Sequence, residues 1–498
     1  MPTEHEERGA FMRVLLVFPS TGYYTSGLAT PLGLLSIGTY LEQFGHEVML
    51  YDRCMDTTKM KKVFHAFSPE IVGISLMSSR GLKDAFKISK YAKDRGLPVI
   101  WGGQLPSLQI DLVLQSPYVD MVSFGEGEET WAELLECLDT GDFSDVLGLA
   151  YKKEGKIITN PCRPFMDLAK LPATDWSLID VSKYTQPYLA NKKMMYVCSS
   201  KGCPARCAFC VNVNFHKSTY RKRPTEIVLQ EIRYLIEHYG VDSIYFSDEL
   251  WSLTRSDARE FCQRILDEGL QFHWGVDTRI DLLREEDYRL MYQAGCRWLL
   301  FGIECGSEEM RRRVHKNINY DKVNPTLDLL NEIGFTTITS FIVGFPDETK
   351  EQLQDTINMI KNIHSGLTPI FHFWPIPGTE LYNYLVQQGR YHAPEKIEDL
   401  FGSVATINLG TNYSCVTDRE LKVIKNWFVW KSFTSKNAIN NGKSFEFAKS
   451  TIKDGLRAIS TKGIISFFVN GFAALNEFLY IFYYAHRYPE IRKKYDLQ

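Results

Sequence analysis

The sequence lacks most of the patterns that assign a protein quickly. No G-x-G-x-x-G follows its first apolar run and no G-x-x-x-x-G-K-[ST] occurs, so a nucleotide bound through its phosphates is not expected. It has no internal repeat and no low-complexity segment. Its formal charge is only −3, from 57 Lys and Arg against 60 Asp and Glu, which argues against a nucleic-acid partner.

A disulfide framework and an export signal are also missing. Eleven cysteines in 498 residues do not form the pattern of a small secreted protein, and the opening MPTEHEERGAF is acidic and polar, unlike a signal or transit peptide. We therefore expect a cytoplasmic protein whose cysteines are thiols, some of them metal ligands. The apolar (44%) and charged (23%) fractions are those of a globular chain, and its length predicts two or three domains.

Residues 11–146 alternate short apolar runs with helical patterns. This alternation predicts an α/β fold, here a doubly wound domain with a parallel sheet, in which ligands bind where the strands end. A single glycine at such an end is equally well explained by a tight turn. Several together favour a ligand-cradling rim. The small and polar residues at the expected strand ends are Ser75, Gly102, Gly103, Gln104, Gly125, Glu126 and Gly127.

Three cysteines share one later loop. Cys203, Cys207 and Cys210 form C-x3-C-x2-C, a spacing that can hold three irons of a 4Fe–4S cluster and leave the fourth iron open. Zinc and unligated thiols are the rival interpretations. Zinc favours four protein ligands, and Cys198 and His216 are the only further candidates nearby in sequence. The spacing therefore favours an iron–sulfur cluster.

This triad, with an aromatic residue just before its last cysteine, resembles the radical S-adenosylmethionine (SAM) superfamily. The resemblance implies a partial (β/α)6 barrel over residues 191–412, a cluster whose open iron binds SAM, and one-electron cleavage of SAM to a 5′-deoxyadenosyl radical. Polar or Gly/Pro groups follow each expected barrel strand. The resemblance assigns no catalytic residue beyond the cluster, and it implies that either Asp248 or Glu249 faces the SAM ammonium. The SAM contacts that it implies at these positions are Phe209, Asp248, Glu249, Arg279, Glu304, Gly344 and Pro377.

With that core identified, residues 11–146 resemble the cobalamin-binding domain that precedes many radical SAM cores. The likeness is carried by TPLGLLSIGTYLEQFGHEVMLYD, the GGQLPS turn and VSFGEGEET, and it points to the group of the anaerobic magnesium-protoporphyrin ester cyclase and the C- and P-methylases. It implies cobalamin on the rim named above. The D-x-H-x-x-G motif that supplies cobalt with a histidine elsewhere is absent, so no axial histidine is expected. His46 is taken as a surface residue.

The resemblance implies a methyltransferase that acts on an unactivated carbon through a 5′-deoxyadenosyl radical and methylcobalamin. An oxidative cyclase or rearrangement enzyme without methyl transfer is the first alternative, and a cobalamin sensor with an inactive core is the second. The expected partners are a small-molecule substrate and an external one-electron donor of the flavodoxin or ferredoxin type.

The end of the chain differs in composition from the rest. After a connector at residues 147–190 and the core, residues 413–498 are expected to be helical, and from residue 416 on they carry fourteen Lys or Arg, seven Asp or Glu and sixteen aromatics. Residues 463–485 are apolar, but Asn470, Asn476 and Glu477 argue against a membrane span. Two interpretations remain: a helix across the barrel mouth, or an interfacial helix that meets anionic lipid and implies a hydrophobic substrate.

Overall fold

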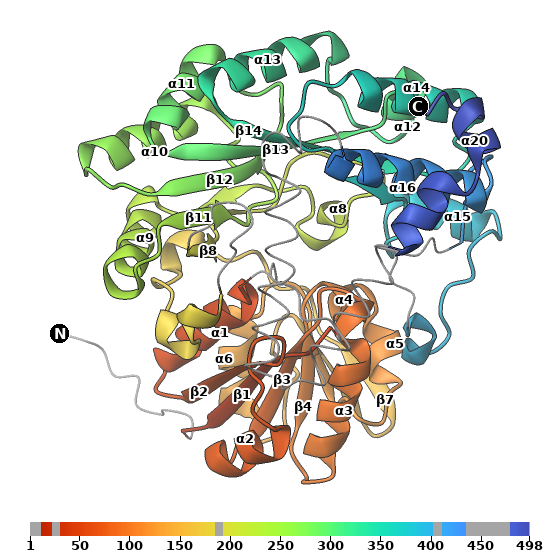
Figure 1. Cartoon of the computed structure of the whole chain (residues 1–498). Helices are drawn as coiled ribbons and strands as arrows, with labels where there is room; N and C mark the ends of the chain where they lie inside the picture. The colour runs from red at the N-terminus through yellow and green to blue at the C-terminus, as the bar shows by residue number, and fades with distance from the viewer. Residues whose placement is uncertain (1–10, 22–29, 185–192, 402–410, 435–478, 498) are drawn as a thin grey trace.

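Two α/β bodies stacked on one another make up the protein (Figure 1). The computed structural model describes residues 11–21, 30–184, 193–401, 411–434 and 479–497. The expected fold class is confirmed: a mostly parallel N-terminal sheet is followed by a six-stranded parallel half barrel and by C-terminal helices.

The N-terminal sheet has the strand order β2-β1-β3-β4-β5-β6-β7. Its first five strands are parallel, whereas β6 and β7 form an antiparallel hairpin hydrogen-bonded to β5. Part of the expected connector at residues 147–190 thus forms a hairpin that extends this sheet beyond residue 146, because an antiparallel hairpin can join a sheet edge without a crossover helix. The strands are β1 (Arg13–Phe18), β2 (Glu47–Asp52), β3 (Ile71–Ser75), β4 (Val99–Gly102), β5 (Met121–Ser123), β6 (Leu149–Lys153) and β7 (Lys156–Thr159).

Helices cover both faces of this sheet, which explains the uninterrupted apolar run of β1. Val14 and Leu16 pack in one core with α1 (Leu32–Glu42) and α6 (Glu128–Cys137), while Leu15 and Val17 pack in the opposite core. Successive strand residues point to opposite faces, so a strand covered on both sides must be apolar throughout. The opposite core is covered by α2 (Met60–Phe67), α3 (Leu82–Lys93), α4 (Gln104–Leu108) and α5 (Ile110–Leu114).

The half barrel has its six parallel strands in sequence order, and all six strands expected in the core are present. They are β8 (Met194–Val197), β11 (Ser243–Phe246), β12 (His273–Thr278), β13 (Cys296–Glu304), β14 (Thr336–Val343) and β15 (Ile370–His372). A two-stranded antiparallel ribbon of β9 (Ser200–Lys201) and β10 (Arg221–Lys222) lies beside it. Helices connect the strands: α8 (Asn212–Phe215), α9 (Thr225–Tyr239), α10 (Arg255–Asp267), α11 (Glu285–Gln293), α12 (Glu308–Arg313), α13 (Val323–Ile333), α14 (Lys350–Asn362) and α15 (Glu380–Gln387).

Short connector segments bind the two bodies together. The Asp175 amide donates to the Thr39 hydroxyl of α1 at 2.9 Å, and the Tyr184 hydroxyl donates to the Asp52 carboxylate at the end of β2 at 2.6 Å. Trp176 is buried among residues of the barrel core. The connector is therefore packed against both bodies.

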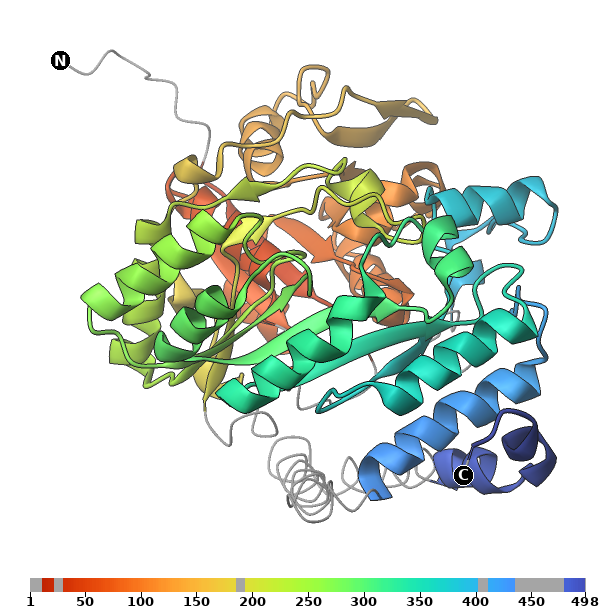
Figure 2. The same ribbon diagram turned by 90° about the horizontal axis from the view of Figure 1, so that it is seen from above.

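The C-terminal helices α16 (Asp418–Thr434) and α20 (Pro489–Lys494) lie at the β15 edge of the half barrel, as the blue ribbons of Figure 2 show. Ile491 and Tyr495 are buried in the barrel core, and Lys494 forms an ion pair with Glu420 of α16. Among the described residues no helix is both long and apolar enough to cross a bilayer. Most of the apolar stretch 463–485 lies outside the described residues.

Candidate functional site

A cavity of about 300 Å³ lies between the two bodies, where the carboxyl ends of their strands face each other. From the half barrel it is lined by residues that follow β8 and β11, among them Cys198, Lys201 and Glu249. From the N-terminal sheet it is lined by every residue expected in the cobalamin rim: Ser75, Gly102, Gly103, Gln104, Gly125, Glu126 and Gly127. The fold thus gathers these residues around one space.

The rim is built from tight backbone turns. Gly103 has φ of 92°, and a Cβ there would stand 2.8 Å from the Leu76 carbonyl oxygen, so only glycine fits. The Ser107 hydroxyl of α4 donates to the Gly103 carbonyl at 2.7 Å and accepts the Gly125 amide at 3.1 Å. Sequence reasoning missed Ser107, whose side chain joins the turns after β4 and β5. It was also wrong about His46, which was taken as a surface residue but is buried between α1 and β2, with 8% of its surface exposed.

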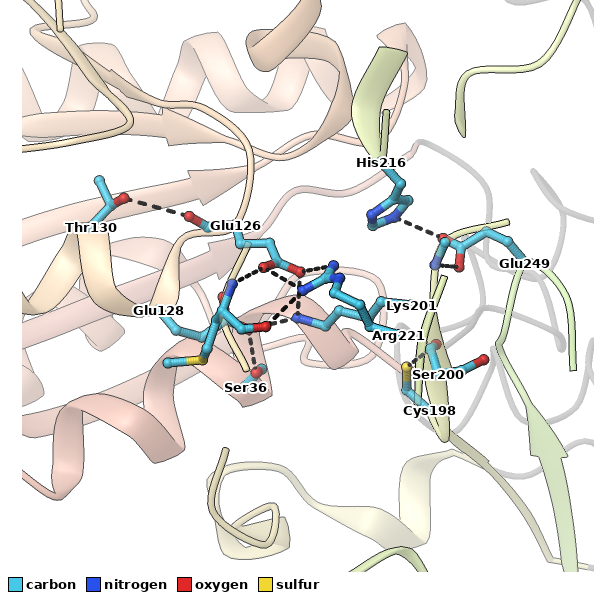
Figure 3. A network of polar contacts seen from close by, with 12 residues as sticks. Ser36, Glu126, Glu128, Thr130, Cys198, Ser200, Lys201, His216, Arg221 and Glu249 are labelled. Carbon is cyan, nitrogen blue, oxygen red and sulfur yellow. Dashed lines mark hydrogen bonds and ion pairs between the residues drawn. The ribbon is translucent and has the colours of Figure 1, made fainter. Parts of the chain in front are cut away.

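The Glu126 carboxylate joins the rim to the half barrel (Figure 3). It accepts hydrogen bonds from the Arg221 guanidinium of β10 at 2.6 and 3.0 Å and from the Met166 amide at 3.1 Å. The sequence predicts Glu126 as a cobalamin contact. In the structure it lines the cavity, but its oxygens are already engaged by the other domain.

Glu128 and Lys201 form a second bridge beside it. The Lys201 ammonium lies 3.0 Å from the Glu128 carboxylate, which also accepts the Ser36 hydroxyl at 2.6 Å. Burial opposes both charges, but their attraction outweighs it, so the pKa of Lys201 is raised and that of Glu128 is lowered. No local pattern in the sequence pairs residues so far apart along the chain.

The cysteine loop is clamped between two barrel helices. The Ala208 amide donates to the Val314 carbonyl after α12 at 3.1 Å, and the Ala208 carbonyl accepts the Leu381 amide of α15 at 3.1 Å. The Phe209 ring packs against Phe345, with ring centroids 5.6 Å apart. Backbone contacts rather than the side chain of Phe209 alone therefore fix the loop.

The cysteine side chains fit a cluster with three protein ligands. All three are free thiols. Burial raises the pKa of Cys207, as do Glu304 and Cys203, and burial raises the pKa of Cys210 to about 11, as do Cys207 and Cys203. The Lys316 ammonium opposes both shifts. In the described part of the chain no three His, Cys, Asp or Glu side chains converge on one ion. An iron–sulfur cluster does not need that convergence, because each cysteine binds a different iron.

The two residues considered as further zinc ligands are engaged elsewhere. The Cys198 thiol donates to the Ser200 carbonyl at 3.0 Å, and burial raises its pKa. The His216 Nε2 lies 3.1 Å from Glu249. The zinc interpretation therefore lacks a fourth ligand among the described residues.

The two adjacent acids after β11 have different roles. Asp248 is 2% exposed and accepts the Ser199 amide at 2.8 Å and the hydroxyls of Ser199 and Ser200 at 2.5 and 2.6 Å. Burial raises its pKa to about 6. Glu249 lines the cavity, and its second oxygen accepts the Gly202 amide at 2.9 Å. Asp248 therefore joins the ends of β8 and β11, and only Glu249 reaches the cavity.

The remaining expected SAM contacts fall into two groups. Glu304, whose φ is 72°, forms an ion pair with Lys316 at 3.1 Å, and Arg279 forms one with Asp281. The charge of Glu304 raises the pKa of Cys207 and that of Arg279 lowers it, so both lie near the cysteine loop. Gly344 instead lies against α16, where a Cβ would stand 2.9 Å from Leu421. Pro377 is half-buried in the turn before α15. As SAM contacts these residues stay predictions.

Comparison with known proteins assigns both domains. Residues 24–135 match the B12 binding domain, and residues 197–360 match the radical SAM superfamily. A protein of Pyrococcus horikoshii named as an uncharacterized methyltransferase is 30% identical over 387 residues, which cover 75% of this chain and 83% of the relative. The anaerobic magnesium-protoporphyrin IX monomethyl ester cyclase of Rubrivivax gelatinosus is 26% identical over 394 residues, 75% of this chain and 70% of the relative.

A solved structure shows the same fold. The radical SAM methyltransferase TsrM of Kitasatospora setae, with cobalamin and a 4Fe–4S cluster bound, superposes with a TM-score of 0.65 at 19% identity, covering 77% of this chain and 80% of that one. The expected family and its cofactors, a 4Fe–4S cluster, SAM and cobalamin, are confirmed by these matches. The chain belongs to the radical SAM enzymes that carry an N-terminal B12-binding domain.

Proposed function

We propose that the protein is a cobalamin-dependent methyltransferase that methylates an unactivated carbon of a small molecule. The observation that carries this proposal is the single cavity onto which both the cobalamin rim and the barrel strand ends open. When bound, the cluster and SAM supply a 5′-deoxyadenosyl radical, and cobalamin supplies the transferred methyl group. The relative named as an uncharacterized methyltransferase supports methyl transfer as the reaction class.

The chain's own residues position these groups and exclude water. The glycine turns of the rim let a ligand approach the backbone closely, and Glu126 and Glu128 hold the half barrel over it through Arg221 and Lys201. Trp131 is among the apolar residues of the lining. A dry, closed cavity is what radical chemistry needs, because water and oxygen would divert the reactive species.

The test is anaerobic incubation of the reconstituted protein with SAM carrying a deuterated methyl group, a reductant and candidate extracts. We expect 5′-deoxyadenosine together with a product that is heavier by a deuterated methyl group, and neither from a variant lacking the three loop cysteines. Deoxyadenosine without methyl transfer would instead support an oxidative cyclase or rearrangement enzyme, which the likeness to the R. gelatinosus cyclase favours. If neither deoxyadenosine nor a methylated product forms, the result would support a cobalamin sensor with an inactive core.

We also propose an acidic one-electron donor, of the flavodoxin or ferredoxin type, as a partner at the outer side of the cysteine loop. Arg206, within the loop, is exposed, as are Arg312 and His315 after it, and the His315 Nδ1 lies 3.2 Å from the Arg206 carbonyl oxygen. The exposed guanidinium groups of Arg206 and Arg312 beside the cluster loop would attract a negative partner. Reduction by flavodoxin should slow with added salt and slow severalfold in Arg206→Glu, whereas reduction by dithionite should not change.

A further inference from the structure

Lys316 is a nearly buried lysine beside the cysteine loop, and sequence reasoning did not single it out. The two residues before it contact that loop. The Val314 carbonyl accepts the Ala208 amide at 3.1 Å. The His315 Nδ1 lies 3.2 Å from the Arg206 carbonyl oxygen. The side chain of Lys316 is only 12% exposed, so its charge acts on the loop with little screening by water.

The ammonium of Lys316 forms an ion pair with Glu304 on one face of β13. Its Nζ lies 3.1 Å from the Glu304 Oε1, and the Glu304 side chain is 10% exposed. The pair covers Gly302, where a Cβ would collide with the carboxylate and stand 2.9 Å from Nζ. The neighbours Phe301 and Ile303 point the other way, into the barrel core. The pair therefore lies on the open side of the half barrel, at the end of β13.

The positive end of this pair is the one that acts more strongly on the loop. Burial opposes the charge of Lys316, but Glu304 outweighs it, so the pKa of Lys316 is raised and the side chain is an ammonium. Burial raises the pKa of both Cys207 and Cys210, and Lys316 opposes both shifts. Its effect on each thiol is larger than that of Glu304. The ammonium thus stabilises negative charge at the cysteine loop.

The same charge should act on a cluster held by this loop. Reduction adds one electron, and so one negative charge, to the cluster, and the surroundings of an iron–sulfur cluster set its potential. We propose that the Lys316 ammonium raises the reduction potential of the cluster and that Glu304 limits this effect. The electron comes from the external one-electron donor, and no bond of the chain forms or breaks. The inference concerns the cluster and does not depend on methyl transfer.

Arg279 is the other cation that lowers the pKa of Cys207, and it should contribute less. It forms an ion pair with Asp281, and the two side chains are 22% and 26% exposed. Water reaches this pair more readily than it reaches Lys316 and Glu304, so the charge of Arg279 is screened more strongly.

The test is a redox titration of the full-length protein carrying its cluster, without SAM, followed by the paramagnetic resonance of the reduced cluster. Lys316→Met leaves the Glu304 carboxylate unbalanced beside the loop. Reduction should then become about tenfold less favourable, a fall of about 59 mV for a one-electron couple. Glu304→Gln leaves the ammonium unbalanced and should shift the potential the opposite way, by about three- to fivefold in the equilibrium constant. Lys316→Arg keeps the charge and should stay within about threefold of the wild type.

Lys93→Met is the matched control. Lys93 pairs with Asp120, which precedes β5 at the amino end of the N-terminal sheet, so the loss of this pair should leave the potential unchanged. Unchanged potentials in both Lys316→Met and Glu304→Gln, or shifts of the same sign, would overturn the proposal, because a disturbed fold does not follow the sign of the charge removed.

A Lys316→Met protein that fails to hold a cluster leaves the decision to Glu304→Gln. A raised potential in that variant supports the proposal, and an unchanged or lowered one overturns it. The proposed methyltransferase activity stands in either case, because the deuterated methyl group of SAM tests it separately.

Discussion

The loop cysteines are the residues on which the chemistry depends most directly. Replacing Cys203, Cys207 or Cys210 by Ala removes one of three protein ligands, so each variant should lose the visible absorption of the cluster and all SAM cleavage. Iron and sulfide analysis and deoxyadenosine formation measure this. Cys262→Ala, which removes a buried thiol of the barrel core, is the control and should keep its cluster. A triple variant that retained a full complement of iron would refute the assignment.

The buried carboxyl of Glu348 predicts how the stability of the protein depends on pH. It is fully buried after β14, one oxygen accepts the Gly344 amide at 2.6 Å, and burial raises its pKa to about 8. A carboxyl whose pKa is raised on folding favours the folded state in its neutral form, so its contribution is full below its unfolded pKa of about 4.3 and is lost as pH rises through 8.

Glu348→Gln keeps an acceptor for the Gly344 amide and cannot ionise. Relative to this variant, the wild type should lose stability between pH 5 and pH 9, by on the order of 4 kcal/mol. Urea unfolding of both proteins across that range is the measurement. Parallel stability profiles would show that the wild-type carboxyl is not held neutral by the fold.

At the scale of elements, the exposed side chains of the C-terminal helices bear on membrane contact. Leu479, Phe482 and Tyr483 are exposed apolar or aromatic side chains at the start of the last described segment. Of the basic residues beyond them, Arg492 lies over the Trp427 ring at 5.1 Å and Lys494 pairs with Glu420, so both are turned toward α16. Arg487, Lys493 and Lys494 are exposed, and the contacts of Arg492 and Lys494 with α16 reduce the basic charge available to lipid.

We propose that this exposed aromatic surface meets anionic lipid and that the substrate is correspondingly hydrophobic. The protein should then sediment with anionic liposomes at low salt, less at high salt, and not after deletion of residues 463–498. Arg487→Glu is a smaller change that leaves the buried contacts of α20 in place and should weaken sedimentation. If the full-length protein stays in the supernatant at low salt, the segment serves only as a packed helix at the barrel edge.

At the scale of the whole molecule, buried charges hold the two domains together. Lys201→Met would leave Glu128, which is 3% exposed, as an uncompensated buried charge and should destabilise the protein by about 3–5 kcal/mol. Lys222→Met, in the same ribbon but paired with the exposed Glu260, should cost less than about 1 kcal/mol. Urea unfolding of both variants is the measurement.

The double variant Lys201→Met with Glu128→Leu tests whether the unpaired charge of Glu128 causes the loss of stability in Lys201→Met. It should recover most of the loss, because removing both charges leaves no buried ion unpaired. Equal destabilisation by Lys201→Met and Lys222→Met would contradict the role given to the interdomain bridge.

Much of the fold could be predicted because its signals are local. Strands buried on both faces read as continuous apolar runs, as β1 does, and the three cysteines lie close in space because they lie close in sequence. The rim residues from Ser75 to Gly127 could be grouped as well, since the carboxyl ends of parallel strands meet at one edge of a sheet. Sequence alone thus determined the two domain types, the cysteine loop and the rim.

Only the tertiary structure decided which side chains meet across the domains. Glu126 contacts Arg221 from 95 positions away, and His216 meets Glu249 from 33. It also separated Asp248 from Glu249, because neighbouring residues leave a strand end in different directions, one toward β8 and one toward the cavity. Such pairings depend on how the domains pack. A buried charge or an unpaired ring nitrogen costs free energy only where the fold has excluded water around it.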